Sequence, residues 1–327
     1  MERYPAGTGA TVVEGLAMTE VPLRFDGRVA IVTGAGRGLG KAYAELLAAR
    51  GAKVVVNDLG APIKGDGANA GVAQQLVDEI TAAGGEAIAD TNSVATPEGV
   101  QAIVQTALDA FGKVDILIHN AGNVRYGTIR EISLDDFRSV IDVHFMSAFY
   151  LVQALHPLMC DAGYGRVVLT SSIGGIYGNE RCVNYAMAKS GMIGLNNVAA
   201  LEGEPFGVRS NVILPSAVTR MADSLDTSAY PPLGPELVAP AVAWLAHERC
   251  DLSGEMIAAI GGRLARAFIA ETQGLYHPDW TIEEVDLAMA RVRDKHEVLD
   301  FGLHGHSGHI GYSFEMTRTA AKEPTHP

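Results

Sequence analysis

A glycine-rich turn between a short apolar run and a helix-forming segment most constrains what this chain can fold into. The run Arg28–Thr33 is rich in β-branched residues, which predicts a strand buried on both faces. It is followed by Gly34, Gly38 and Gly40, and then by the helix formers of Lys41–Arg50. Glycines in such a turn let backbone N–H groups approach a pyrophosphate at the helix N-terminus. The pattern therefore predicts a dinucleotide-binding unit.

Beyond this unit, strand-like runs keep alternating with helix-like segments. The alternation predicts a single α/β domain: a Rossmann-type, doubly wound parallel sheet of seven strands with helices on both faces, plus a C-terminal extension. The further strands are expected at Lys53–Asn57, Glu86–Asp90, Val114–His119, Arg166–Thr170, Val208–Leu214 and Glu255–Ile260. The further helices are expected at Val72–Ala83, Pro97–Phe111, from the capping pair Ser133 and Asp136 to about Leu158, around Tyr185–Ala200, and at Pro235–His247.

Length and composition suit one large domain. The 327 residues are 48% hydrophobic and 19% charged, which is typical of a globular protein, and no linker divides the chain. We expect a mobile N-terminal extension over residues 1–20 and the dinucleotide-binding catalytic domain over residues 21–262. Residues 263–301 should form an ordered extension that adds nothing to the sheet. Residues 302–327 should form a polar tail.

Several classes of function are disfavoured. The net charge of −13 argues against a nucleic-acid partner. No apolar run approaches the ~18 residues of a membrane helix, and residues 1–20 lack the features of a signal peptide. Three well-separated cysteines indicate a reduced, cytoplasmic setting. No residues have metal-ligand spacing except a histidine cluster in the polar tail, so no metal is expected. That cluster is His304, His306 and His309.

Three polar residues together predict acid/base chemistry. Tyr185 and Lys189 share one helix face, and Ser172 follows the strand that ends at Thr170. A phenol with a pKa of about 10 carries protons poorly at neutral pH, but a neighbouring ammonium lowers that pKa. The serine hydroxyl can hold the substrate oxygen, which completes a centre for an alcohol/carbonyl pair. The simpler alternative for Ser172 is a strand-end cap, and for Cys182 a side chain that lines the pocket.

Asp58, at the end of the second strand, indicates which nicotinamide cofactor is bound. It stands where a carboxylate accepts hydrogen bonds from the adenosine ribose. Against a 2′-phosphate, that carboxylate costs about 4 kcal/mol per unit charge at ~4 Å and an effective dielectric of ~20. Arg37 could pair with the phosphate, but an exposed arginine returns only about 0–1 kcal/mol. The sequence therefore predicts NAD.

Taken together, these residues resemble the short-chain dehydrogenase/reductase family. The resemblance rests on Thr33–Gly40, Asn120-Ala121-Gly122, Ser172, Tyr185 and Lys189, and it covers about Leu23–Gly262. Val56–Gly60 and Gly175–Asn179 resemble one branch of that family, the (3R)-hydroxyacyl-CoA or 17β-hydroxysteroid dehydrogenases. This branch includes the dehydrogenase region of the peroxisomal multifunctional enzyme. Arg263–Phe301 is similar to the extension found in that branch.

The resemblance also implies roles for residues around the cofactor. His144 stands where the family usually has an asparagine that relays protons; here it implies either a relay through the imidazole or a histidine hydrogen-bonded within the core. Lys189 would also bind the nicotinamide ribose. The remaining implied contacts are Gly34, Gly38, Leu39 and Gly40 at the pyrophosphate, Asp58 at the ribose, Ser93 and Val94 at the adenine, Asn120 at the adjoining ribose with Ala121 and Gly122 over the adenosine, and Ala217, Val218, Thr219 and Arg220 at the nicotinamide end.

The sequence thus predicts an NAD-dependent oxidoreductase that interconverts a secondary alcohol and a ketone on a bulky apolar substrate. A 17β-hydroxysteroid and a 3-hydroxyacyl-CoA both remain open. One alternative is an NADPH-dependent reductase of 3-oxoacyl thioesters, and another is a catalytically silent nucleotide-binding subunit. Apolar faces on Phe137–Leu158 and Tyr185–Ala200 predict a homodimer or homotetramer. The extension should dock beside the substrate opening of its own or a neighbouring subunit, or else reinforce the oligomer.

Overall fold

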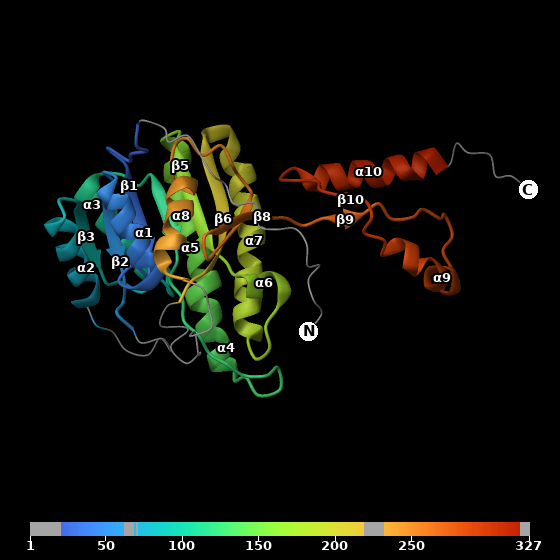
Figure 1. Ribbon diagram of the computed structural model, residues 1–327, viewed down its shortest axis with the longest axis horizontal. Coiled ribbons are helices and arrows are strands. Elements are labelled where there is room, and N and C mark those ends of the chain that lie inside the picture. Colours follow the sequence, from blue (N-terminus) through green and yellow to red (C-terminus); the bar gives the residue numbers. More distant parts are fainter. Residues whose placement is uncertain (1–20, 62–68, 70, 219–231, 321–327) are drawn as a thin grey trace, which may run out of the picture.

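The core of the fold is a single β-sheet of eight strands among the described residues, and the strands lie side by side across the view in Figure 1. The computed structural model describes residues 21–61, 69, 71–218 and 232–320, so the predicted extension at 1–20 lies outside the described residues. The strand order is β3-β2-β1-β4-β5-β6-β7-β8. The strands are β1 (Val29–Thr33), β2 (Lys53–Asn57), β3 (Glu86–Asp90), β4 (Ile116–His119), β5 (Gly165–Thr170), β6 (Val208–Ser216), β7 (Met256–Ile260) and β8 (Arg263–Ala267).

Helices cover both faces of this sheet, which confirms the doubly wound α/β fold. One apolar cluster joins the sheet to α1, α2 and α8, and a second joins it to α3, α5 and α7. Alternate residues of one strand enter opposite clusters, as Ile31 and Val32 do on β1. The helices are α1 (Gly38–Ala49), α2 (Gly71–Ala82), α3 (Pro97–Phe111), α4 (Leu134–Ile141), α5 (Ser147–Asp161), α6 (Ile173–Tyr177), α7 (Val183–Gly203) and α8 (Ala239–Leu245).

The sheet has eight strands, so the prediction of seven is wrong, as is the expectation that the extension adds nothing to it. Strands β1 to β7 pair in parallel, whereas β8 pairs antiparallel with β7. Gly261 and Gly262 join them with Ile260 opposite Arg263, and both glycines have positive φ, 55° and 83°. A two-residue turn with two positive φ angles matches the twist of a hairpin. The glycine pair therefore turns the chain back along the sheet edge.

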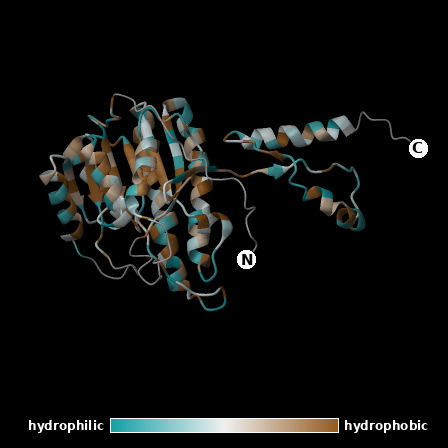
Figure 2. Cartoon of the chain, in the orientation of Figure 1, coloured by the Kyte–Doolittle hydropathy of each residue, from teal (hydrophilic) through white to brown (hydrophobic). Residues whose placement is uncertain are grey.

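Residues 268–320, which we call the arm, extend away from the body that carries the sheet (Figure 1). The arm contains β9 (Glu271–Thr272), α9 (Ile282–Val292), β10 (Val298–Leu299) and α10 (Gly305–Ala320). A capping box between Thr281 and Glu284 starts α9. Helix α10 lies where the sequence predicts a polar tail. The body strands are largely hydrophobic, whereas polar and apolar residues mix along the arm (Figure 2).

Polar contacts fix the base of the arm to the body. The Arg266 guanidinium lies 2.6 Å from a carboxylate oxygen of Glu255 on the body and 2.7 Å from one of Asp300 on the arm. His304 lies 3.2 Å from Glu204 at the end of α7. These groups are partly exposed, so each contact contributes little alone. Together they give the arm a defined starting direction.

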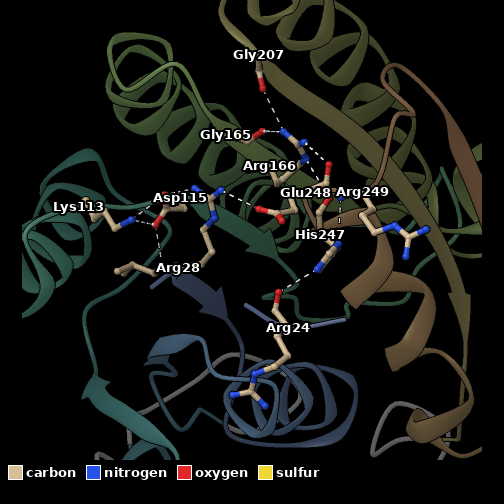
Figure 3. Close-up of polar contacts among 11 residues, drawn as sticks. Arg24, Arg28, Lys113, Asp115, Gly165, Arg166, Gly207, His247, Glu248 and Arg249 are labelled. Atoms are coloured by element: carbon tan, nitrogen blue, oxygen red, sulfur yellow. Dashed lines mark hydrogen bonds and ion pairs between the residues drawn. The ribbon is translucent and has the colours of Figure 1, made fainter. Parts of the chain in front are cut away.

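A buried arginine, Arg166, makes several hydrogen bonds near the N-terminal ends of the strands, opposite the ends where the candidate site lies (Figure 3). Arg166 on β5 is 4% exposed and donates to the carbonyls of Gly165, Gly207, His247 and Glu248 at 2.8 to 3.3 Å. Three of these carbonyls follow α7 and α8, where helices leave acceptors unpaired. Arg166 therefore binds the segments that follow α7 and α8.

One helix runs without a break from Leu134 to Asp161, through α4, a π-helical segment η1 (Asp142–Met146) and α5. The Ser133 hydroxyl caps it by accepting from the Asp136 N–H at 3.0 Å, as the sequence predicts. By length and composition alone this helix could cross a membrane, a test that core helices also pass. Leu151, Leu155 and Met159 pack in the core beside the sheet, which is the behaviour of a core helix.

Candidate active site

A cleft of about 350 Å³ opens at the carboxyl ends of the parallel strands and holds most of the predicted site residues. This is where ligands bind in open α/β sheets. Gly40, Ser172 and Val218 are described but do not line the cleft, while Thr219 and Arg220 lie outside the described residues. The predicted residues that line it are Gly34, Arg37, Gly38, Leu39, Asp58, Ser93, Val94, Asn120, Ala121, Gly122, His144, Tyr185, Lys189 and Ala217.

The glycine turn is closely packed against its own helix. Gly34 and Gly38 have positive φ, 62° and 55°. A β-carbon at Gly40 would overlap the carbonyl of Gly34, so helix α1 can begin this close to β1 only with glycine there. This arrangement brings the N-terminus of α1 to the cleft, where a pyrophosphate fits.

Backbone N–H groups hold the carboxylate of Asp58 from two sides. Its oxygens accept hydrogen bonds from Gly36 N at 2.8 Å and Gly60 N at 2.7 Å. Neither bond was predicted from the sequence; Gly60, two residues after Asp58, was a local signal for one of them, whereas Gly36 is 22 residues away. Arg37 is exposed at the edge of the same cleft. Asp58 therefore presents a fixed negative charge, while Arg37 is a surface side chain.

Asn120 ties β4 to the glycine turn. Its side-chain amide donates to the carbonyls of Thr33 at 3.2 Å and Gly34 at 3.0 Å. The Thr33 hydroxyl in turn accepts from the backbone N–H groups of Asn120 and Ala121. The residue assigned from the resemblance to a ribose contact thus also holds two loops of the cleft together.

Ser172 and Tyr185 meet beside the cleft. Ser172 caps α6 by accepting from Gly174 N at 3.1 Å, so its alternative role as a cap is also realised. Burial raises the pKa of Tyr185, and a hydrogen bond with Ser172 acts in the opposite direction. The two hydroxyls are therefore close enough to interact, as a proton-exchanging group and a neighbour that holds the substrate oxygen must be.

Lys189 lies one helical turn further along α7 and is 3% exposed. Burial lowers its pKa to about 7. Its ammonium donates to the Thr170 carbonyl at 2.5 Å and lies 5.6 Å from the centroid of the Tyr185 ring. The groups that shift the pKa of Tyr185 in this structure do not include Lys189, which was predicted to lower it. That role stays a prediction.

The histidine cluster that was weighed as a metal site is dispersed. His304 lies next to Glu204, and His309 lies 3.1 Å from Glu271. Within residues 21–61, 69, 71–218 and 232–320, no three histidine, cysteine or carboxylate side chains gather as metal ligands do. Cys182, expected to line the pocket, is buried at the start of α7 and is not among the lining residues.

Comparison with known proteins identifies the family. The family model described as short chain dehydrogenase matches residues 28–229. The chain belongs to the short-chain dehydrogenase family. Enzymes of this family are oxidoreductases that use nicotinamide cofactors and act on small molecules. The cleft contains the glycine turn and the Asp58 carboxylate that the sequence predicts to contact such a cofactor. The resemblance stated from the sequence is confirmed.

Named relatives refine this placement. The chain is 47% identical over 260 residues to peroxisomal multifunctional enzyme type 2 of Drosophila melanogaster. The aligned region covers 79% of this chain and 43% of that protein. The full-length structure of that enzyme matches with a TM-score of 0.74 and 38% identity, over 90% of this chain and 50% of that one. A structure of a 7α-hydroxysteroid dehydrogenase complexed with NADH matches with a TM-score of 0.67 and 31% identity. The match covers 73% of this chain and 95% of that one. The chain thus spans about half the length of its multifunctional relatives.

These names correct one prediction. The sequence analysis expected a cytoplasmic protein from cysteine usage and the absence of signal-peptide features. Relatives from fly, mouse and yeast are named peroxisomal enzymes instead, which contradicts that expectation. Cysteine usage indicates only a reducing environment, and it does not distinguish one reducing compartment from another.

Proposed function

We propose that this protein is an NAD-dependent dehydrogenase that oxidises the secondary alcohol of a 3-hydroxyacyl-CoA to a ketone. The observation that carries the proposal is the pairing of Ser172 with Tyr185 beside a cleft that also contains the fixed carboxylate of Asp58. Relatives named hydratase-dehydrogenase-epimerase support the substrate class, because hydration of an unsaturated acyl chain leaves an alcohol for the dehydrogenase to oxidise.

In this mechanism the Ser172 hydroxyl binds the substrate oxygen and Tyr185 exchanges the hydroxyl proton with it. A bound nicotinamide supplies the hydride acceptor. Lys189, once protonated, places a positive charge near the Tyr185 ring and favours phenolate when the proton leaves. General acid/base catalysis of this kind contributes about 10²–10⁴-fold. Thr170 holds Lys189 in place through its carbonyl.

Apolar side chains near this pair suit a bulky substrate. Ile173 and Tyr177 on α6, the helix that Ser172 caps, are 43% and 81% exposed. Tyr126 lies close enough to Tyr185 to raise its pKa and is 62% exposed itself. Covering such surface with an acyl chain or a sterol contributes about 25 cal/mol per Å². A hydroxysteroid therefore remains the second substrate of this class.

An NADPH-dependent reductase of 3-oxoacyl thioesters is the alternative function, and Arg37 is the observation that favours it. Its side chain lines the cleft on the side of Asp58. A relative from Synechocystis, 35% identical over 247 residues, is named 3-oxoacyl-[acyl-carrier-protein] reductase. Asp58 acts against this alternative, since it is held where a 2′-phosphate would come close.

We also propose a homo-oligomer in which the arm serves a neighbouring subunit. Among the described residues, those that line the cleft all precede 218, so the described arm does not border the cleft of its own subunit. Phe149, Val198 and Phe206 on and near α5 and α7 are 40 to 51% exposed. The arm itself exposes Ile269 and Leu287, at 69 and 81%. A second copy would bury both sets of side chains.

The experiment that tests the proposed function is NADH formation from NAD with three substrate classes: a 3-hydroxyacyl-CoA, a 17β-hydroxysteroid and a small secondary alcohol. We expect the highest kcat/KM with the 3-hydroxyacyl-CoA. A higher kcat/KM with the steroid would change the proposed substrate class but leave the proposed reaction, oxidation of a secondary alcohol, unchanged. Oxidation of none of the three, together with reduction of a 3-oxoacyl thioester by NADPH, would establish the alternative.

A further inference from the structure

His144 is a buried residue of the cleft wall, in an irregular part of its helix. It lies in the π-helical segment η1, between α4 and α5, and is 2% exposed. π-helical turns within α-helices often occur at functional sites, because the extra residue turns a side chain out of the regular helical row. The backbone carbonyl of His144 is itself fixed, since it lies 3.0 Å from Nε2 of the buried His119.

The His144 imidazole contacts two parts of the active site at once. Its Nε2 lies 2.8 Å from the carbonyl oxygen and 3.0 Å from the backbone nitrogen of Asn123. Asn123 directly follows the Asn120–Gly122 turn that lines the cleft. The other contact is the Tyr185 ring, which packs against the imidazole in a T-shaped arrangement with centroids 5.3 Å apart and an interplanar angle of 82°.

Gly122 is shaped to this imidazole. A β-carbon at position 122 would overlap Cε1 of His144 and lie 3.0 Å from its Nε2. Gly122 is not among the glycines with positive φ, so its backbone conformation suits other residues. The requirement for glycine at this position therefore comes from the His144 ring.

The same contacts leave the imidazole poorly placed to pass protons. Nε2 is engaged by the Asn123 backbone, and Nδ1 is buried with no hydrogen-bond partner among the described residues. Burial and the nearby Lys189 both lower the pKa of His144 well below its usual value. A relay needs a group that binds and releases a proton along a hydrogen-bonded path. A neutral ring whose Nε2 contacts the Asn123 backbone instead makes a fixed structural contact.

We propose that His144 is a positioning residue: its ring braces the Gly122–Asn123 backbone on one side and the Tyr185 ring on the other. The proposal rests on the proposed role of Tyr185 as the acid/base, and it decides between the two roles that the sequence left open for His144. The ring sets the distance between Tyr185 and the Asn120–Asn123 loop, which lines the cleft. Misplacing reacting groups by about 1 Å can cost about 10²-fold in rate.

The test compares Gly122→Ala, His144→Ala and the double variant. The matched control is Gly71→Ala, because Gly71 is exposed, does not line the cleft, and a β-carbon there approaches only the Asn69 side chain, at 3.2 Å. We expect Gly122→Ala to lower kcat by about 10²-fold. His144→Ala should lower kcat more than it changes KM, without moving the pH dependence of kcat/KM. The double variant should be more active than Gly122→Ala alone, because removing the ring makes room for the new methyl group.

Two results would overturn the proposal. One is a double variant no more active than Gly122→Ala. The other is evidence of proton transfer through His144: added imidazole restores the kcat of His144→Ala, or the pH dependence of kcat/KM in that variant is shifted. If His144→Ala fails to fold, the same measurements on His144→Asn decide. NADH binding and the activity of Tyr185→Phe are measured in parallel, so a failure of the proposed function appears as an active Tyr185→Phe protein and is distinguished from a failure of the bracing role.

Discussion

Replacing Asp58 by asparagine should relax the choice of cofactor. The wild-type carboxylate cannot turn away from an incoming 2′-phosphate, because Gly36 N and Gly60 N bind its two oxygens at 2.8 and 2.7 Å. Asparagine keeps the shape of the side chain and one of the two acceptor oxygens while removing the charge. The change therefore isolates electrostatic repulsion from the packing of the loop.

The size of the effect follows from this geometry. Two unit charges about 4 Å apart repel by about 4 kcal/mol at an effective dielectric of ~20. Asp58 is half-buried, so solvent and salt screen the pair, and we take roughly half of that value, ~2 kcal/mol. This corresponds to about a 30-fold change in the ratio of kcat/KM for NAD to that for NADP.

The assay is kcat/KM for each cofactor, measured at one ionic strength with a saturating alcohol. Glu45→Gln is the control, because it removes a carboxylate on α1 that is not among the residues lining the cleft. The control should keep the preference of the unaltered protein, and Asp58→Asn should lose most of it. Equal kcat/KM for NAD and NADP in the unaltered protein would refute the reasoning, as would an Asp58→Asn variant that still prefers NAD by the full ratio.

Three further results are expected. The pKa of Lys189 is about 7 in the folded protein and about 10.4 in the unfolded chain, so the unfolded chain binds more protons between those pH values and the free energy of unfolding should rise with pH there. In urea titrations Lys189→Met should show a smaller rise. The same rise in the variant and the unaltered protein would contradict the burial argument. Light scattering at micromolar concentration should give at least a dimer, and a monomer would count against the proposed assembly. Truncation after Ala267, which keeps β8, should raise KM for bulky substrates; an unchanged KM in a folded oligomer would remove the arm from the substrate site.

The parts of the fold that depend on local signals could be predicted. Lys53–Asn57 and Glu86–Asp90 were placed at the residues where the structure has them, because short β-branched or apolar runs bounded by loops are typical of buried strands. Pro97–Phe111 was placed equally well. Its N-terminus carries the expected proline, and it ends at Gly112 in the left-handed conformation. Each of these segments carries its own start and stop signals.

The missed parts depend on partners distant in sequence. Strand β8 carries two arginines and little apolar pattern, and its extended conformation comes from pairing with β7. The Gly261-Gly262 pair was its one local signal. Helix α10 contains glycines, which are poor helix formers, so its sequence favours a tail. The hydrogen bond from Gly36 N to Asp58 likewise forms only once β2 and the glycine turn lie side by side.

The catalytic assignment also depended on contacts that spacing alone leaves open. Tyr185 and Lys189 were predicted from their separation on a helix, and both line the cleft. The bond from Lys189 to the Thr170 carbonyl was not predicted, and a capping role for Ser172 was considered only as an alternative, without its partner Gly174. Both follow from the fold of the loop after β5. Short-range sequence patterns could therefore identify the residues but not the hydrogen bonds that orient them.

The most direct test of the account is the activity of Tyr185→Phe, measured beside its affinity for NADH. The phenol oxygen is the only heavy atom removed, so cofactor binding should stay close to that of the unaltered protein. Turnover should fall by about 10²–10⁴-fold, since the group that exchanges the substrate proton is gone. A Tyr185→Phe protein that keeps more than about a tenth of its activity would contradict the central claim.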